Sequence, residues 1–288
     1  MALAEFERAG AFGGQVERVA AAGQAQALEL VRAGAAAGAV VPIESSVEGA
    51  INPTLDALAV GPRLQIVAEV ELDVAFTIVA RPGIGLDQVR TVAAYPIAAA
   101  QVRQWLEATL PNAPVHPSGS NAAAAQDVAD GLADAAVSTA LAGRRLGLAV
   151  LADGVADYQG AVTRFVLVTP PGPAPAPTGA DRTSVVLELP NVPGSLMRAF
   201  GEFSHRGIDL TMIESRPTRT GIGSYRFYLD CVGHIEDDAV AEALKALHRT
   251  AEVRYLGSWP ACSGTGMAPP PHAEATSWLA DLRKGVAE

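Results

Sequence analysis

A run of prolines divides this sequence into two parts. Between residues 170 and 177 the chain reads Pro-Pro-Gly-Pro-Ala-Pro-Ala-Pro, and no helix or strand periodicity continues through it. Proline lacks a backbone N–H and fixes φ, so neither a helix nor an inner strand contains such a run. The segment favours extended polyproline geometry, which acts as a semi-rigid spacer. The sequence therefore predicts one domain on each side, and 288 residues suffice for both.

The N-terminal part alternates between short apolar segments and segments with helical periodicity. Strands are expected at residues 39–43, 64–69, 72–80, 91–95, 135–138, 148–152 and 162–169. Helices are expected at residues 1–10, 24–32, 98–110, 120–130 and 141–146, and one more begins with Asn52 as its N-cap. This alternation predicts an α/β domain over residues 1–169, with a mostly parallel sheet that helices cover on both faces.

The order of elements changes after the proline run. Strands are expected at 183–189, 208–216, 224–232 and 252–259, with helices at 192–205 and 237–248. The order β-α-β-β-α-β is that of a ferredoxin-like domain. The expected division is therefore a linker over 170–182, a ferredoxin-like domain over 183–260 and a C-terminal tail over 261–288, with a short helix at 277–282.

Charge and cysteine usage narrow the classes of function. The net charge is −10 and no cluster of lysine and arginine stands out, whereas nucleic-acid binding needs a basic surface. No apolar run reaches the ~18–20 residues of a membrane span, and no basic-then-apolar leader opens the sequence. Cys231 and Cys262 favour a reduced, cytoplasmic compartment, and the five histidines lack metal-ligand spacing. We therefore expect a cytoplasmic protein without nucleic-acid, membrane or metal partners.

Three polar segments stand at strand ends or helix starts, where ligands bind in open α/β sheets. They are residues 42–49, 118–121 and 163–165. Each also has an ordinary structural explanation: a solvated turn for the first, a helix cap at Ser120 or Asn121 for the second, and a strand threonine for Thr163. No Ser-His-Asp order, Walker loop or glycine-rich dinucleotide loop is present in the sequence. These residues alone indicate a small-anion enzyme or a binding protein.

Taken together, the polar segments resemble a known family. The motifs are Val-Pro-Ile-Glu-Ser-Ser-Val-Glu-Gly at 41–49, Leu-Asp-Val at 72–74, Ser-Asn-Ala-Ala at 120–123 and Thr-Arg-Phe at 163–165. They are similar to the catalytic domain of the prephenate dehydratases of the monofunctional bacterial type. Asn-Val-Pro-Gly-Ser-Leu at 191–196 and Ile-Glu-Ser-Arg-Pro at 213–217 resemble the regulatory ACT domain of that family. The motifs occur in order along nearly the whole chain.

The resemblance implies a fold and a reaction. The implied fold is a bilobal catalytic domain similar to the type II periplasmic binding proteins, with the active site between its lobes, followed by a ferredoxin-like ACT domain. The implied reaction is the decarboxylating dehydration of prephenate to phenylpyruvate in L-phenylalanine biosynthesis, without a cofactor or a metal. The family also implies feedback inhibition by L-phenylalanine, and a homodimer or homotetramer formed through the ACT domains.

The resemblance also assigns residues. The family's essential threonine corresponds to Thr163, and Arg164 and Phe165 complete the catalytic motif. The implied substrate-binding residues are Glu44, Ser45, Ser46, Ser120, Asn121 and Ala122. The implied effector-binding residues are Asn191, Pro193, Gly194, Ser195, Leu196, Glu214, Ser215 and Arg216. Two roles stay open for Arg164, which either holds a substrate carboxylate or pairs with Glu44. Phe165 fits core packing equally well, and strand alternation places Arg164 on the opposite face from Thr163.

The residue types suit this reaction. Loss of CO2 from prephenate pushes electrons into the ring and expels the hydroxyl group, so the step needs a donor at the leaving oxygen and anchors for two carboxylates. The Thr163 hydroxyl is the expected donor. The backbone N–H groups of the helix that starts near Ser120 are the expected anchor for one carboxylate.

The sequence departs from the family pattern in three places. Ser45 stands where the family usually has Asn, and Ser195 where it has Ala or a similar small residue. The family's opening strand and its Gly-Pro-x-Gly-Thr-Phe loop have no counterpart, because residues 1–10 already match the helix that follows them. This last departure leaves an alternative open, a catalytically impaired amino-acid-sensing or binding protein of the same fold.

Overall fold

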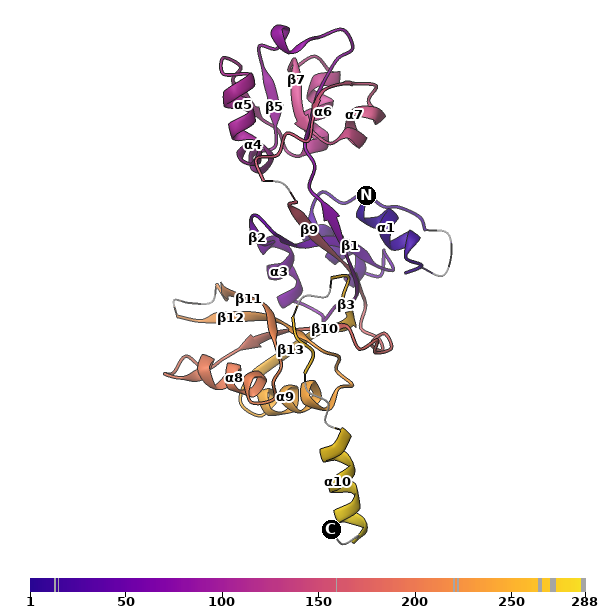
Figure 1. Cartoon of the computed structure of the whole chain (residues 1–288), viewed down its shortest axis with the longest axis vertical. Helices are drawn as coiled ribbons and strands as arrows, with labels where there is room; N and C mark the ends of the chain where they lie inside the picture. Colours follow the sequence, from indigo (N-terminus) through magenta and orange to yellow (C-terminus); the bar gives the residue numbers. More distant parts are fainter. Residues whose placement is uncertain are drawn as a thin grey trace. The chain divides into compact units, whose positions relative to one another are not determined.

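The computed structural model describes residues 1–12, 14, 16–158, 160–219, 221, 223–263, 266–269 and 273–285. The expected C-terminal tail, 261–288, therefore lies partly outside the described residues. The chain forms two compact units (Figure 1). Unit 1 comprises Met1–Leu72 and Thr163–Glu288, and unit 2 comprises Asp73–Val162.

The first sheet of unit 1 has four strands in the order β2-β1-β9-β3. The strands are β1 (Ala39–Ser45), β2 (Gly49–Ala50), β3 (Gln65–Asp73) and β9 (Val162–Thr169). The helices of this part are α1 (Ala2–Arg8), α2 (Gln24–Arg32) and α3 (Asn52–Ala59). Helix α3 begins one residue earlier than expected, at Asn52, and its N-cap is Ile51, which stays extended and donates its N–H to Ile43 O (2.8 Å).

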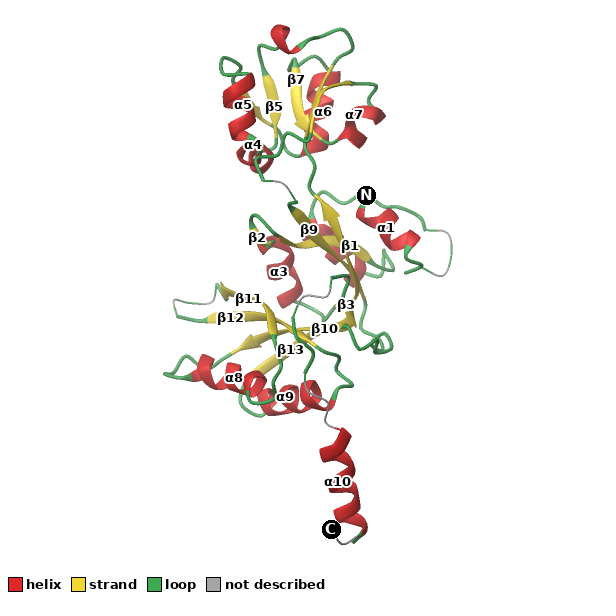
Figure 2. Ribbon diagram, viewed as in Figure 1, coloured by secondary structure: helices red, strands yellow, loops and turns green. Residues whose placement is uncertain are grey.

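Unit 2 contains a five-stranded sheet in the order β6-β5-β7-β4-β8. Its strands are β4 (Thr77–Ala80), β5 (Val92–Ala94), β6 (Val115–Pro117), β7 (Ala135–Ser138) and β8 (Ala149–Asp153). Its helices are η1 (Leu86–Gln88), α4 (Pro96–Gln101), α5 (Arg103–Thr109), α6 (Asn121–Ala129) and α7 (Ala140–Arg145). Figure 2 labels two strands of this sheet, β5 and β7, and the helices α4, α5, α6 and α7 beside them. One continuous helix was expected over 98–110. The chain breaks at Val102 instead, because the Asp157 carboxylate accepts the N–H groups of Gln104 (3.1 Å) and Trp105 (3.4 Å) and caps α5 separately.

The expectation of a mostly parallel sheet is wrong. In unit 1, β1 runs antiparallel to both β2 and β9. In unit 2, β5 is parallel to β6 and β7, whereas β4 is antiparallel to β7 and β8. A strand that is apolar on both faces looks the same in sequence whichever way its neighbours run, so the pattern reports burial and not direction.

The ferredoxin-like part of unit 1 has the expected β-α-β-β-α-β order. Its elements are β10 (Asp181–Glu188), α8 (Ser195–Ser204), β11 (Leu210–Pro217), β12 (Tyr225–Val232), α9 (Asp238–His248) and β13 (Glu252–Pro260). The strands form an antiparallel sheet in the order β11-β12-β10-β13. Helices α8 and α9 pack on one face of it, around Val185, Leu187, Phe203 and Leu247. A further helix, α10 (Ala273–Lys284), follows.

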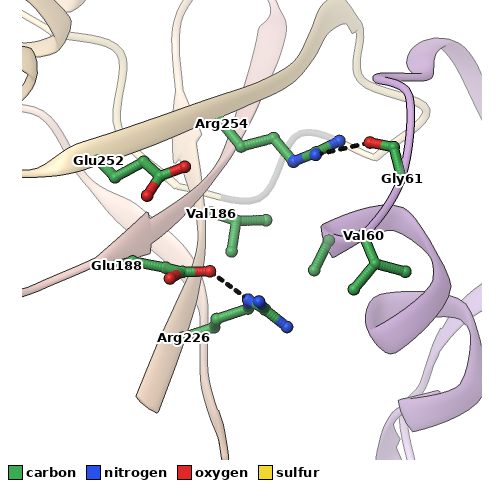
Figure 3. A pocket seen from close by; sticks show the side chains of 8 residues that line it. Val60, Gly61, Val186, Glu188, Arg226, Glu252 and Arg254 are labelled. Carbon is green, nitrogen blue, oxygen red and sulfur yellow. Dashed lines mark hydrogen bonds and ion pairs between the residues drawn. The ribbon is translucent and has the colours of Figure 1, made fainter. Parts of the chain in front are cut away.

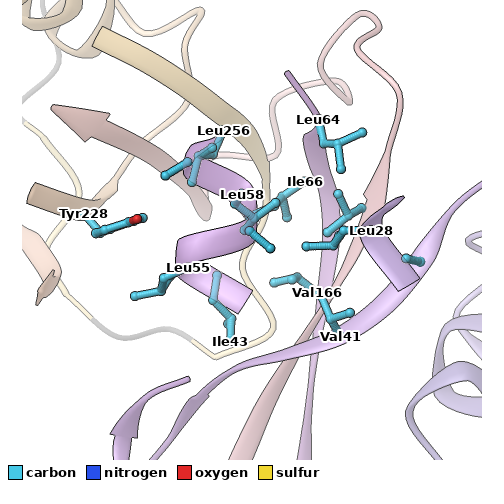
Figure 4. Packing of buried hydrophobic residues seen from close by; sticks show 14 of the residues in the cluster. Leu28, Val41, Ile43, Leu55, Leu58, Leu64, Ile66, Val166, Tyr228 and Leu256 are labelled. Atoms are coloured by element: carbon cyan, nitrogen blue, oxygen red, sulfur yellow. The ribbon is translucent and has the colours of Figure 1, made fainter. Parts of the chain in front are cut away.

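The other face of the ferredoxin-like sheet shares a core with the first sheet of unit 1 (Figure 4). Ile43, Leu55, Leu58, Ile66 and Val166 belong to the same buried cluster as Val186, Met212, Tyr228, Leu256 and Trp259. The proline-rich segment therefore links two parts that are packed against each other, which a spacer between independent domains would not do. Among the described helices, none is both long and apolar enough to cross a membrane.

Candidate active site

Strands β1 and β9 bring the expected catalytic and substrate-binding segments together. The antiparallel register places Ser45 opposite Thr163 and Glu44 opposite Arg164, with an irregularity in β1 between Pro42 and Glu44. Directly opposed residues of an antiparallel pair point to the same face of the sheet. Two motifs that are far apart in the sequence therefore form one local structure in unit 1.

Thr163 lies where the chain returns from unit 2 to unit 1. In unit 2, the outgoing and returning segments run side by side, and Val74 donates its N–H to Ala161 O at 2.7 Å. The Thr163 side chain is half-buried, and its hydroxyl makes no hydrogen bond to another of the residues that the structure describes. It is therefore free to donate to a ligand.

The loop after β1 is organised by Ser45. Its side chain is buried, and its Oγ accepts the backbone N–H groups of Val47 and Glu48, both at 3.3 Å. Ser46 is exposed. A serine at this position thus shapes the turn through a short side chain-to-backbone motif.

Arg164 points away from Thr163 and into unit 1. Only 5% of its side chain is exposed, and it lies on the same face of β9 as the core residues Val166 and Val168. Its Nη2 contacts Glu44 Oε2 at 2.8 Å and Asp230 Oδ2 at 2.7 Å, and its Nη1 contacts Glu69 Oε2 at 3.1 Å. Of the two roles considered for Arg164, the structure shows the pairing with Glu44.

Arg164, Glu44, Glu69, Asp230 and Arg182 form a charge cluster, which we call the buried charge cluster because all its members except Glu44, whose side chain is 36% exposed, are buried. Arg182 Nη1 contacts Glu69 Oε2 at 2.9 Å, and the backbone N–H of Cys262 donates to Glu69 Oε1 at 3.0 Å. Burial opposes ionisation of Glu69, but the charges of Arg182 and Arg164 outweigh it and hold the pKa of Glu69 below its ordinary value. Burial likewise opposes the charge of Arg164, and the three carboxylates nevertheless raise its pKa.

The sequence reasoning missed three members of this cluster, Glu69, Asp230 and Arg182. Each is a charged residue within a strand, and each is buried. Charged residues are rarely buried unless they are paired. For Asp230, a single charge in the otherwise apolar segment 227–232 was a signal that could have found it, although it does not name the partner. Glu69 and Arg182 have other charged or polar residues beside them in their strands, so the sequence carries no such signal for them.

The remaining expected substrate-binding residues lie at the start of α6 in unit 2. Ser120 is the N-cap, and its Oγ accepts the N–H of Ala123 at 3.0 Å. Asn121 and Ala122 occupy the first turn, where N–H groups lack partners within the helix. The Asn121 Oδ1 atom is buried and has no hydrogen-bond partner among the described residues.

The expected effector-binding residues lie at the start of α8 and on β11. Gly194 is the N-cap of α8 with φ of 81°, so the helix begins at Ser195, three residues later than expected. Glu214, Ser215 and Arg216 are on β11, an edge strand of the ferredoxin-like sheet. Arg216 binds Asp56 of α3 through two hydrogen bonds, of 3.1 Å from Nε and 2.9 Å from Nη2.

A cavity of about 250 Å³ lies between the C-terminal end of α3 and the ferredoxin-like sheet (Figure 3). Arg254 Nη2 donates to Gly61 O at 2.8 Å, and Arg226 pairs with Glu188 at 2.5 Å. The other lining residues are Ala59, Val60, Val186 and Glu252. None of the residues expected in the active or effector site lines this cavity. Among the described residues, no group of three or more His, Cys, Asp or Glu side chains could hold a metal ion.

Comparison with known proteins identifies the family. The family model for prephenate dehydratase matches residues 3–172, and the ACT domain model matches residues 183–249. The chain belongs to the prephenate dehydratase family. A prephenate dehydratase from Mycolicibacterium gilvum is 62% identical over 273 residues, which cover 94% of this chain and 88% of the relative. The chain is therefore an enzyme of this family with an ACT domain.

Solved structures of the family agree with the fold. A prephenate dehydratase from Arthrobacter aurescens in complex with L-Phe is 41% identical, with a TM-score of 0.86 over 94% of this chain and 92% of that one. A structure described as GqqA, a novel type of quorum quenching acylase, is 29% identical, with a TM-score of 0.73 over 88% and 92%. Because a protein described with a different activity has a similar fold, the fold alone does not assign the reaction.

Proposed function

We propose that this enzyme converts prephenate to phenylpyruvate, water and CO2 in L-phenylalanine biosynthesis. The breaking C–C bond to the carboxylate supplies the electron pair that aromatises the ring, and the ring C–O bond breaks with loss of hydroxide, which takes up a proton as water. No redox change or external electron acceptor is needed. The observation that carries the proposal is the pairing of Thr163 with Ser45 across β1 and β9, with the Thr163 hydroxyl free to donate.

In this proposal Thr163 donates a hydrogen bond to the leaving oxygen. Ser45 and Ser46 line the site, with Ser45 shaping the turn, whereas Glu44 lies on the other face of the sheet, where it pairs with Arg164. The first turn of α6 at Ser120, Asn121 and Ala122 binds a substrate carboxylate through backbone N–H groups. Arg164 supports the site from the opposite face of β9 and does not bind the substrate, because its guanidinium is already paired with carboxylates of the protein. Phe165 stands opposite Pro42 in the sheet and is assigned to packing.

Replacement of the Thr163 hydroxyl tests the catalytic assignment. Thr163→Val keeps the shape of the side chain, so we expect kcat for phenylpyruvate formation to fall by about 10²–10⁴-fold, the range typical of a lost proton donor. Thr163→Ser should retain much more activity than Thr163→Val. The matched control is Thr169→Val at the other end of β9, whose hydroxyl donates to Pro170 O. Wild-type turnover by Thr163→Val would remove Thr163 from the mechanism.

We further propose that L-phenylalanine is a feedback inhibitor that binds the ACT domain. Support comes from the motif residues Asn191, Pro193, Gly194, Ser195 and Leu196 at the start of α8, from Glu214, Ser215 and Arg216 on β11, and from the relative described as a complex with L-Phe. An amino-acid carboxylate is suited to a helix start. We propose a homodimer or homotetramer formed through the ACT domains, and a cytoplasmic location.

Calorimetric titration with L-phenylalanine tests the effector. Binding heat is expected together with loss of phenylpyruvate formation, whereas D-phenylalanine serves as the control ligand. Absence of heat at millimolar L-phenylalanine would contradict regulation while leaving the catalytic proposal intact. Binding of L-phenylalanine by an enzyme without turnover would instead favour the amino-acid-sensing alternative.

A further inference from the structure

The buried charge cluster joins strand β9 to the ferredoxin-like domain. Arg164 is on β9, whereas Asp230 is on β12, the strand next to the edge of the ferredoxin-like sheet. Both side chains are almost entirely buried, and the Nη2–Oδ2 distance is 2.7 Å. Glu44 and Glu69, which complete the shell around Arg164, come from β1 and β3. Three strands of the catalytic part and one strand of the ACT domain therefore meet at a single guanidinium.

Asp230 depends on Arg164 for its partner. Its Oδ2 contacts Arg164, and its Oδ1 is buried with no hydrogen-bond partner among the described residues. A buried carboxylate without a partner is costly, so Asp230 does not stabilise the ferredoxin-like domain by itself. Buried charges of this kind are retained in some proteins because they specify one geometry. The geometry specified here is that of Arg164.

The geometry of Arg164 bears directly on the candidate active site. Arg164 follows Thr163 on β9, and it binds Glu44, which precedes Ser45 on β1. The register of the two strands is irregular between Pro42 and Glu44, so backbone pairing is interrupted next to the site. The ion pair between Arg164 and Glu44 connects β9 to β1 through side chains at the point where the strand register is irregular. Displacement of Arg164 would change the positions of Thr163 and Ser45 together.

We propose that Asp230 of the ACT domain is a positioning residue for the dehydratase reaction, which acts by holding Arg164 and through it Thr163. This inference rests on the proposed function of Thr163. It makes β12 a structural part of the active-site support, and Met212 adds to it, since its Sδ lies 3.6 Å from Arg164 Nη2. Met212 stands opposite Asp230, two residues before Glu214 of the proposed effector site. A shift of β11 on effector binding would therefore move Met212, which contacts Arg164 directly.

Charge neutralisation at Asp230 tests this proposal without leaving a cation unpaired. The cluster holds two guanidinium groups and three carboxylates, so Asp230→Asn leaves two positive and two negative charges. We expect kcat to fall by about tenfold or more, with KM within about threefold, since a small misplacement of a reacting group is costly. Asp230→Glu keeps the charge but moves the carboxylate, and a similar loss is expected. The control is Asp56→Asn, which removes a different contact between the ACT domain and α3 and should keep wild-type kcat.

A double-mutant cycle separates positioning from general damage. If Asp230 acts through Thr163, then Asp230→Asn should lower kcat by less than about threefold in the Thr163→Val background. Equal losses in both backgrounds, or wild-type kcat in both Asp230 variants, would overturn the proposal. If Asp230→Asn does not fold by circular dichroism, the cycle with Asp230→Glu decides. Failure of the wild-type enzyme to turn over prephenate would overturn the proposed function instead, which is a distinct outcome.

Discussion

At the scale of single residues, Thr163 and Arg164 lie on opposite faces of β9 and differ in their surroundings. Thr163 keeps a free hydroxyl, whereas Arg164 is buried with three carboxylates around it. Loss of Arg164 would leave those carboxylates without their shared cation, a change that is strongly destabilising in buried clusters. Variants of Arg164 therefore report on folding more than on chemistry, and the more informative residues are its partners.

Glu69 makes the stability of the enzyme dependent on pH. Its pKa in the folded protein lies below the ordinary value of 4.5, because Arg182 and Arg164 outweigh the effect of burial. The ionised carboxylate therefore stabilises the fold fully above pH 4.5, and this stability is lost as the pH falls towards the lowered pKa. We expect wild type to lose more free energy of unfolding than Glu69→Gln between pH 6 and pH 3, measured by urea denaturation. Parallel pH profiles of the two proteins would show that Glu69 does not contribute.

At the scale of secondary-structure elements, one glycine allows β13 to approach β3. Gly257 has φ of 145°, and a Cβ atom placed there would lie 2.2 Å from the carbonyl oxygen of Ile66. The sheet register also shifts at this point, between Ser184 and Val185 of β10. The position thus combines a backbone conformation that favours glycine with a contact that leaves no room for a side chain.

Gly257→Ala should therefore separate the ferredoxin-like sheet from β3. We expect a loss of about 2–4 kcal/mol in the free energy of unfolding, from backbone strain and overpacking together. The measurement is chemical denaturation followed by circular dichroism. Gly172→Ala is the matched control, because its Cβ would meet no atom within 4 Å and its backbone is not in the left-handed region. Equal stability of the two variants would contradict the close approach.

At the scale of the whole molecule, the ACT domain and the first sheet of unit 1 behave as one packed body. They share a core that includes Leu58 of α3 and Leu256 of β13, and two sets of ion pairs reinforce the contact. A shared core predicts a single cooperative transition for these two parts. Movement within this unit would accordingly repack an interface and not merely stretch the proline-rich segment.

Leu58→Ala tests this cooperativity from the catalytic side. The side chain is fully buried, so the substitution should cost about 2–5 kcal/mol. In a Trp105→Phe, Trp278→Phe background, Trp259 fluorescence follows unfolding of the ACT domain. The unfolding midpoint measured by this fluorescence should fall by the same amount as the midpoint measured by circular dichroism. Leu282→Ala, on the exposed side of α10, serves as the control. An unchanged Trp259 transition in Leu58→Ala would show that the two parts unfold independently.

The sequence by itself determined the elements that depend on local patterns. Helix α2, strand β7 and strand β9 have the expected bounds, and the β-α-β-β-α-β order is confirmed. Family motifs supplied the candidate site, and the family is confirmed by comparison. Apolar periodicity and turn residues act over a few positions, which is why they can be read from the chain alone.

Tertiary structure alone decided the strand directions, the break at Val102 and the partners of Arg164. Strand direction depends on which distant segments pair with each other, and the break depends on Asp157, far along the chain. The charge cluster brings Glu44, Glu69 and Asp230 to one guanidinium from three separate strands. No local pattern records such pairings, because the energy of a buried charge depends on what the fold places beside it.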